Sequence, residues 1–317
     1  MNQPAKYMFM MEYINSILKN NIKINNDTIA KDFDLHLRTL STDIFIEKLI
    51  YTGYIPDIYA SDSSEETLFA KLVEVMTAEW ARRMGFHSQY IKQKSSYQDV
   101  DIVISDRVVV CDAKSFRLGR SQMAPNVKDF LKLADIAKWL DRYSEAKRLG
   151  GLIVYPCKHE WAKGSDVYQY CSTKATPTLM LPYKYLAFLL KYSTQYDTKN
   201  LVQLWDHARI FPVALKNKAT NKKDYWDIIN QEIIRITKTT PEVLSIFMSS
   251  ADQSINNCIK ANIAYLQKVL ENIKIQKRRQ LNQLDKRQLE DRLLNIMIEK
   301  DSKNIGQSLI NINKFRL

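Results

Sequence analysis

The clearest pattern along the chain is a pair of β-branched triplets. Residues 102–104 (Ile-Val-Ile) and 108–110 (Val-Val-Val) are separated by Ser105-Asp106-Arg107. β-Branched residues favour strands, and a short polar segment between two such runs favours a turn. The pattern therefore predicts two adjacent antiparallel strands joined by a tight turn.

Helical and strand patterns continue on both sides of this hairpin. Apolar residues at helical spacing predict helices over 7–20, from Thr42 to Gly53 and from Glu65 to Met84 before it. The order near the hairpin becomes helix, three strands, helix, strand. After the helix that ends at Met84 come a strand over 88–94, the hairpin, a helix over 125–147 and a strand over 150–156. The rest of the chain predicts a short helix from Gly164, a strand over 178–181, a helix over 182–192 and helices from Tyr225 onward, including one over 261–292.

These elements predict an α/β protein with a mixed central sheet flanked by helices. Residues 1–60 form a helical N-terminal region, 61–195 a catalytic core and 196–317 a helical C-terminal region. No internal repeat or low-complexity linker separates them, so we expect one integrated domain.

Three charged residues frame the predicted hairpin. Asp101 enters the first strand and Asp112 leaves the second, so antiparallel pairing brings both carboxylates to the same end. Lys114 follows Asp112 by two residues and shares its strand face. Hard oxygen ligands of this kind suit Mg²⁺, and a lysine beside the metal can orient or deprotonate an attacking water. The hairpin therefore predicts a metal-dependent phosphodiesterase site with Asp101 and Asp112 as ligands.

Further acids can complete this site, and the sequence leaves the choice open. Glu74 and Glu79 lie at the two borders of the apolar arc of the helix over 65–84. Asp99 precedes Asp101 by two residues and competes with it as a ligand. We prefer Asp101 because the apolar triplet starts immediately after it. Most Asp-x-Lys pairs are solvated charges at strand ends, so the combination with the hairpin carries the hypothesis.

Basic residues downstream are candidates for holding the nucleic-acid backbone. Arg117 and Arg120 leave the sheet next to the predicted metal site, where guanidinium groups bind phosphates well. Ser115 and Lys128 are the other candidate DNA contacts.

Composition narrows the class of protein. The chain of 317 residues has a net charge of +12, which favours a polyanionic partner such as nucleic acid. Its four cysteines form no CxxC pair, and its four histidines are scattered, so a zinc site or a histidine-metal nuclease is not expected. No apolar run reaches the ~18 residues that span a bilayer, and no signal-peptide pattern is present. We expect a cytoplasmic protein without a membrane partner.

The sequence resembles a known family. The runs that carry the resemblance are Ser64-Glu-Glu-Thr-Leu-Phe-Ala-Lys71, the Asp101 strand, Asp112-Ala-Lys-Ser-Phe-Arg-Leu-Gly-Arg120, Lys128-Asp129-Phe130, the 151–156 strand and Leu186-Ala-Phe-Leu-Leu-Lys191. Together they resemble the HindIII-like type II restriction endonucleases. The sequence departs from the family where no proline precedes Asp101, where Gly119 replaces a serine and in the insert over 122–126, and these differences bear on the recognition sequence.

The resemblance implies a PD-(D/E)xK nuclease fold and Mg²⁺-dependent cleavage of duplex DNA at a palindromic site, leaving 5′-phosphate and 3′-hydroxyl ends. It also implies a homodimer and a cognate DNA methyltransferase as genetic partner. By position, Asp101 and Asp112 match the metal ligands, Lys114 the catalytic lysine and Glu74 a further acid, which favours Glu74 over Glu79. Two alternatives stay open: a nuclease of this fold that acts in repair or junction cleavage, and a non-catalytic DNA-binding protein.

Overall fold

The computed structural model describes residues 8–18, 25–56, 59–90, 97–117, 125–157 and 161–313, with side chains up to residue 299 except residue 262. Its contacts divide the chain into two units, residues 1–259 and 260–317. The predicted boundaries near residues 60 and 195 both lie inside the first unit, so the predicted division into three regions stays a prediction.

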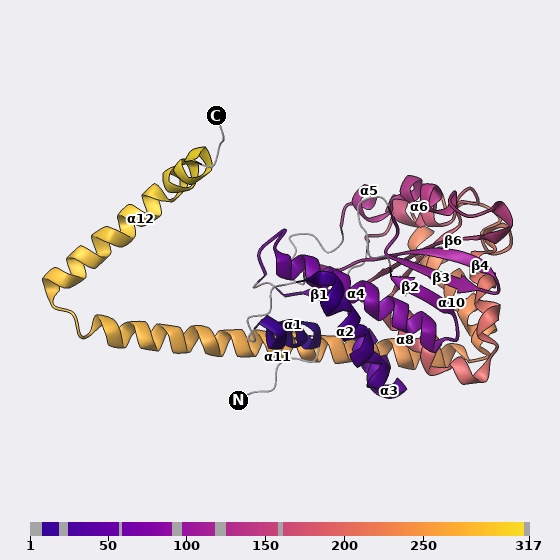
Figure 1. Cartoon of the computed structure of the whole chain (residues 1–317), viewed down its shortest axis with the longest axis horizontal. Coiled ribbons are helices and arrows are strands. Elements are labelled where there is room, and N and C mark those ends of the chain that lie inside the picture. The colour runs from indigo at the N-terminus through magenta and orange to yellow at the C-terminus, as the bar shows by residue number, and fades with distance from the viewer. Residues whose placement is uncertain are drawn as a thin grey trace. The chain divides into compact units, whose positions relative to one another are not determined.

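The first unit is built around a five-stranded mixed sheet with the order β2-β3-β4-β6-β7 (Figure 1). β2 (His87–Tyr90), β3 (Val100–Ile104) and β4 (Arg107–Ala113) are antiparallel neighbours. β6 (Arg148–Tyr155) and β7 (Thr178–Pro182) extend the sheet in parallel with β4. The predicted hairpin and the predicted α/β class with a mixed sheet flanked by helices are therefore confirmed.

The turn of the hairpin has the backbone that two-residue hairpins favour. Ser105 and Asp106 both have positive φ, at 48° and 64°. This left-handed backbone matches the twist of the two strands, and aspartate tolerates it better than most residues. The turn fixes the register that places the acids at the far end of β3 and β4.

Helices cover both faces of the sheet, as two adjacent glycines of β6 show. A Cβ added at Gly150 would meet Trp205, and one added at Gly151 would meet Ile136. Neighbouring strand residues point to opposite faces. Therefore the 3₁₀ helix η4 (Thr198–Trp205) and the helix α6 (Leu133–Leu140) lie on opposite faces.

The long helix α4 (Ser64–Arg83) packs against β2, β3 and β4. Its N-terminus is capped by Ser63, whose hydroxyl accepts a hydrogen bond from the amide of Glu66 at 3.2 Å. The indole of Trp80 donates to the carbonyl of Leu186 in α8 (Tyr183–Lys191) at 2.9 Å. α4 thus connects the antiparallel and parallel halves of the unit.

The N-terminal layer consists of α1 (Phe9–Leu18), α2 (Asn26–Thr39) and α3 (Thr42–Ile50). α2 was missing from the sequence prediction, which placed no helix between residue 20 and Thr42. Its signal was present: Asn25 caps the helix by accepting from the amides of Asp27 and Thr28. The buried Ile29, Ala30, Phe33 and Leu37 then follow at helical spacing.

The prediction of one continuous helix over 125–147 is wrong. The chain instead forms α5 (Val127–Phe130), α6 and the 3₁₀ helix η2 (Glu145–Lys147). Phe130 is fully buried, with ring centroids 4.2 Å from Trp161 and 5.4 Å from Tyr155. Next to this packed ring, the backbone of Leu131 and Lys132 is non-helical, which interrupts the helix.

The remaining elements of the first unit are α7 (Asp166–Cys171), the 3₁₀ helix η3 (Ser193–Gln195), α9 (His207–Ile210) and α10 (Asn221–Thr237). α11 (Pro241–Leu281) begins in the first unit and ends in the second, where α12 (Lys286–Asn313) follows. The single helix predicted over 261–292 is therefore broken between residues 281 and 286. Within the part of the chain that is described, no helix is long and apolar enough to cross a membrane.

Candidate active site

The open end of the β3–β4 hairpin places two aspartates opposite each other. The last paired positions are Val100 and Cys111, and the Asp99 amide donates to the Cys111 carbonyl at 3.0 Å. One residue further, the Asp99 carboxylate accepts a hydrogen bond from the Ala113 amide at 2.8 Å. Asp99 therefore lies across the hairpin from Asp112.

These aspartates belong to a group of charged side chains. The pKa of Asp99 is raised well above its usual value, first by burial and then by the negative charges of Asp112 and Glu74. The Lys114 ammonium acts in the opposite direction and lies 2.6 Å from the Asp112 carboxylate. The structure thus brings together three residues predicted from sequence, Glu74, Asp112 and Lys114, around Asp99.

Asp101 has a different environment. It pairs with Val110, inside the sheet, and its carboxylate accepts a hydrogen bond from Gln98. The pKa of Tyr143 is raised by burial and by its hydrogen bond to Asp101. The sequence argument took the strand to start after Asp101. β3 instead starts at Val100, so Asp99 rather than Asp101 is the acid at the open end of the hairpin.

A small network holds the segment before β3 through Gln98. The Gln98 amide also lies 3.4 Å from the Tyr143 hydroxyl, and Arg142 donates to its side-chain oxygen at 3.4 Å. The Arg142 guanidinium in turn lies 3.7 Å from the centre of the Tyr97 ring. Asp101 therefore belongs to the contacts that fix the approach to Asp99.

Glu74 reaches this end of the sheet from the middle of α4. Its carboxylate lies 2.5 Å from the ammonium of Lys71, one turn earlier on the same helix. Lys71 is only 2% exposed, and its ammonium also lies 5.3 Å from the Tyr90 ring centre. A buried ammonium needs a charged partner, and this contact orients the Glu74 carboxylate.

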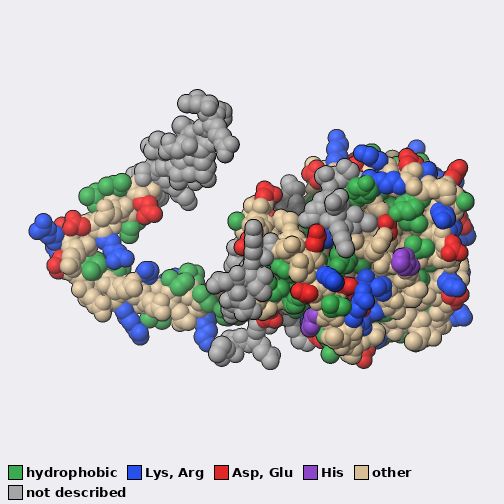
Figure 2. Space-filling model, in the orientation of Figure 1, with side chains coloured by type: hydrophobic (Ala, Val, Ile, Leu, Met, Phe, Trp, Pro, Cys, Tyr) green, Lys and Arg blue, Asp and Glu red, His purple; other side chains and the backbone are tan. Residues whose placement is uncertain are grey.

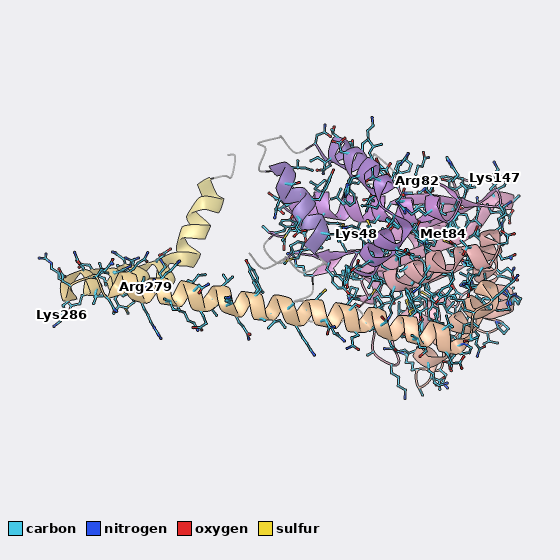
Figure 3. The ribbon with its side chains drawn as sticks, turned by 90° about the horizontal axis from the view of Figure 1, so that it is seen from below. Lys48, Arg82, Met84, Lys147, Arg279 and Lys286 are labelled. Carbon is cyan, nitrogen blue, oxygen red and sulfur yellow. The ribbon has the colours of Figure 1, made fainter. Side chains whose placement is uncertain are left out.

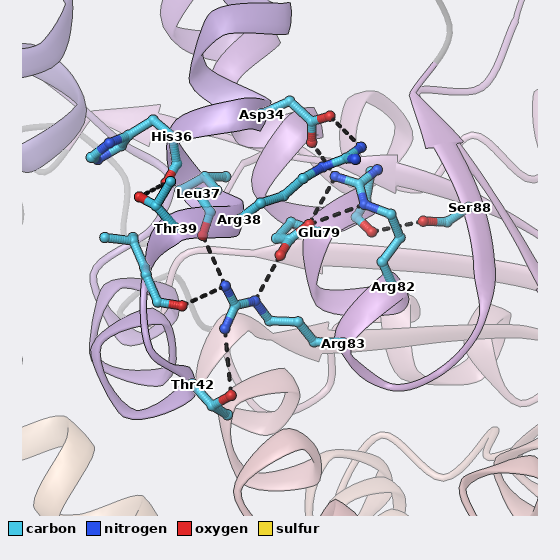
Figure 4. Close-up of polar contacts among 12 residues, drawn as sticks. Asp34, His36, Leu37, Arg38, Thr39, Thr42, Glu79, Arg82, Arg83 and Ser88 are labelled. Carbon is cyan, nitrogen blue, oxygen red and sulfur yellow. Dashed lines mark hydrogen bonds and ion pairs between the residues drawn. The ribbon is translucent and has the colours of Figure 1, made fainter.

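Glu79, the alternative acid on α4, serves a structural network instead (Figure 4). Its carboxylate lies 3.0 Å from Arg82 and 2.7 Å from Arg83. Arg83 also donates to the carbonyls of Leu37 and Leu40, and Arg82 pairs with Asp34. Glu79 therefore ties α4 to α2 and does not join Asp99.

The segment from Lys114 to Arg117 is anchored by residues 53–55 and by Tyr183 of α8. The short strands β1 (Tyr54–Ile55) and β5 (Phe116–Arg117) pair in parallel. The Gly53 carbonyl accepts from the Phe116 amide at 2.8 Å, and the Tyr183 hydroxyl donates to the Lys114 carbonyl at 3.1 Å. Gly53 has φ +90°, and a Cβ there would approach the Lys114 carbonyl to 3.1 Å. Glycine at this position lets the two segments meet.

The predicted DNA contacts have different surroundings. Arg117 donates to the Glu66 carboxylate at 2.7 Å and to the Pro56 carbonyl at 2.9 Å, so it has intramolecular partners. Lys128 is exposed on α5 and Ser115 is partly buried, whereas Arg120 lies outside the described residues. Basic and acidic side chains are intermingled on the visible face of the first unit (Figure 2), so charge alone does not single out a DNA-binding surface.

The charged group fits a divalent cation with few protein ligands. Among the described residues, no three His, Cys, Asp or Glu side chains lie close enough together to enclose a metal ion. Mg²⁺ typically takes only one or two carboxylates and completes its shell with water and phosphate oxygens. Asp99 and Asp112 supply such oxygens. Burial and then the charge of Asp112 raise the pKa of Asp99, and a bound cation would offset the repulsion between the two carboxylates.

Comparisons with known proteins show the family of this chain. The family model described as HindIII restriction endonuclease matches residues 11–297. The chain is 27% identical over 172 residues to the type II restriction enzyme HindIII of Haemophilus influenzae, covering 53% of each chain. The aligned part thus spans about half the length of that relative. Because the family model extends over most of the sequence, the resemblance predicted above is confirmed, and the chain belongs to the HindIII restriction endonuclease family.

Proposed function

We propose that this chain is a type II restriction endonuclease. It cuts both strands of duplex DNA at a short palindromic sequence with Mg²⁺ and leaves 5′-phosphate and 3′-hydroxyl ends. The observation that carries the proposal is the group of Asp99, Asp112, Glu74 and Lys114 at the hairpin end, in a chain of this family. The relative it resembles is named a type II restriction enzyme.

The proposed roles follow from the positions of the charges. Asp112 and Asp99 hold the cation through carboxylate oxygens, while Glu74 adds negative charge from α4. When bound, Mg²⁺ offsets charge on the phosphate and lowers the pKa of a water. The prediction from sequence that Asp101 is itself a ligand remains open to test. Its contacts with Gln98 and Tyr143 support a positioning role instead.

Lys114 orients the attacking water in this proposal. Its ammonium is held 2.6 Å from Asp112 and is partly exposed, so it can hydrogen-bond a water next to the phosphate. Attack of that water on phosphorus breaks the bond to the 3′ oxygen. The phosphate then stays on the 5′ end, and the 3′ oxygen leaves as a hydroxyl.

Cutting both strands calls for two such groups, and each chain supplies one. A homodimer places two sites about a two-fold axis that matches a palindromic sequence. Host DNA contains the same sequence, so the proposal includes a cognate DNA methyltransferase that protects it.

Digestion of phage DNA with Mg²⁺ tests this function against its alternatives. Discrete fragments support a site-specific endonuclease, whereas a smear contradicts site specificity. Preferential cutting of branched DNA would favour a repair or junction nuclease. Binding without cleavage, with any divalent ion, would favour a non-catalytic DNA-binding protein.

A further inference from the structure

The distal part of α11 carries an exposed apolar stripe. Ile263, Leu266, Leu270 and Ile273 are 50%, 51%, 51% and 47% exposed. We call these four residues the α11 stripe. Half-exposed large apolar side chains repeated along one helix are unusual in a soluble monomer, and they mark an interaction surface.

The spacing of the stripe is that of a coiled-coil seam. Its residues follow one another at intervals of three, four and three, which places them on one side of the helix. The same helix buries Leu244, Phe247, Ala251 and Ile255 inside the first unit at similar intervals. The apolar side of α11 therefore continues into the second unit, beyond the part that the first unit covers.

Within the described part of the second unit, nothing covers this stripe. α12 follows α11 closely and has apolar residues of its own, but Leu293, Leu294 and Met297 are 59%, 57% and 54% exposed. Both helices of the second unit thus leave several of their described large apolar side chains half in solvent. A helix of this kind is stabilised by pairing with a helix that has a complementary seam.

We propose that the α11 stripe binds the α11 stripe of a second copy, with the two helices antiparallel. This inference rests on the proposed homodimer and names the surface that forms it. Centred on residue 268, the pairing stacks Ile263 on Ile273 of the partner subunit and Leu266 on Leu270 of the partner subunit. Each layer then combines the two kinds of seam position, as the symmetry of an antiparallel pair requires.

The charge distribution selects the antiparallel orientation. Lys274, Lys277, Arg278 and Arg279 form a basic cluster at the distal end of α11, where Figure 3 labels Arg279 before the turn and Lys286 after it. Parallel helices would place two such clusters side by side. Antiparallel helices separate them by about 25 Å at a rise of 1.5 Å per residue, which is well beyond a screening length of ~8 Å at physiological salt.

Sedimentation of the full chain tests the surface. We expect the double variant Leu266→Gln/Leu270→Gln to weaken dimerisation by at least 100-fold, because two polar layers replace the centre of the seam, while circular dichroism keeps the spectrum of the folded first unit. Ile275→Gln is the matched control: Ile275 is 45% exposed but lies on the opposite side of α11, so its dimer constant should not change. A double variant that dimerises like wild type would overturn the stripe as the interface while leaving the homodimer intact.

Cysteine cross-linking tests the orientation in a Cys258→Ser background, where the other three cysteines are buried. In the antiparallel pair, two copies of residue 263 are about 15 Å apart along the axis, too far for a disulfide, which needs Cα atoms within ~7 Å. Mixing Ile263→Cys chains with Ile273→Cys chains should therefore give a cross-linked heterodimer, and neither variant alone should cross-link. Homodimers cross-linked by one variant would show parallel helices, and a lack of any cross-link would show that another segment covers the stripe; each result overturns the proposal. DNA cleavage by the same samples is scored separately, so loss of this interface and loss of the proposed activity are distinguishable.

Discussion

Asp99 and Asp112 lie opposite each other at the open end of the β3–β4 hairpin, and the Asp99 carboxylate accepts a hydrogen bond from the Ala113 amide at 2.8 Å. Burial and the charge of Asp112 raise the pKa of Asp99 well above its usual value. Two carboxylates facing each other in this way, with Asp112 buried and Asp99 partly buried, repel each other and are costly without a cation. This cost is the physical reason for treating the hairpin end as a metal site.

The first prediction separates Asp99 from Asp101. We expect Asp99→Asn to lose DNA cleavage, because the substitution removes the negative charge of a proposed metal ligand at the open end of the hairpin. Asp101→Asn should lose about 10–100-fold, the range seen when a residue that positions a ligand is changed. Single-turnover rates on one duplex, with DNA binding measured in parallel, decide between them. Complete loss in Asp101→Asn with cleavage retained in Asp99→Asn would restore Asp101 as the ligand.

The second prediction concerns pH and metal. Because the pKa of Asp99 is raised in the folded chain, the protonated form favours folding, and its contribution is lost as pH rises through that raised pKa. We expect the Tm and the free energy of unfolding of metal-free protein to fall over the pH range above the ordinary aspartate pKa. The free energy of unfolding falls by at most about 1.4 kcal/mol per pH unit. Mg²⁺ should restore the Tm most at the higher pH. Thermal melts of Asp99→Asn should lack both effects, and their persistence in that variant would contradict the assignment.

The third prediction compares the two acids of α4. Glu74→Gln should reduce cleavage by more than about tenfold, since it removes charge next to the metal site. Glu79→Gln should instead lower the free energy of unfolding by about 2 kcal/mol, because charged hydrogen bonds to Arg82 and Arg83 are weakened. Its activity per folded molecule should stay close to wild type. Urea titrations and cleavage rates on the same samples show whether the two effects separate in this way.

The fourth prediction compares two basic residues. Lys128 is exposed, and Lys128→Ala should weaken DNA binding and reduce the salt dependence of binding by about one counterion. Arg117 is engaged by Glu66 and Pro56, so Arg117→Ala should lower stability by up to about 1 kcal/mol and leave the salt dependence unchanged. Binding isotherms at several salt concentrations measure both. A reduced salt dependence in Arg117→Ala would return Arg117 to the DNA contacts predicted from sequence.

Local patterns predicted most of the central sheet and much of the site. The β-branched triplets defined the hairpin, and the spacing of Asp112 and Lys114 placed both near its open end. The choice between Asp99 and Asp101 depended on where β3 begins, and Val100 extends that strand by pairing with Cys111. Sequence spacing alone does not fix register, because register depends on the partner strand.

Tertiary contacts explain what the patterns missed. The break between α5 and α6 follows from burial of Phe130 against Trp161 and Tyr155, residues far along the chain. Arg82 and Arg83, which pair with Glu79, also contact Asp34 and Leu37 of α2, a helix that the prediction lacked. Arg117 likewise pairs with Glu66, which lies 51 positions away in the sequence. Each of these depends on a long-range contact rather than on local composition.

Sequencing the DNA ends produced by wild type and by Lys114→Ala tests the central claim most directly. The account predicts that wild type with Mg²⁺ gives uniform 5′-phosphate ends at one repeated palindromic sequence. Lys114→Ala should give none, although it still binds the duplex, because phosphate contacts remain while the water is no longer oriented. Ends scattered over many sequences, or cleavage that survives in Lys114→Ala at the wild-type rate, would contradict it.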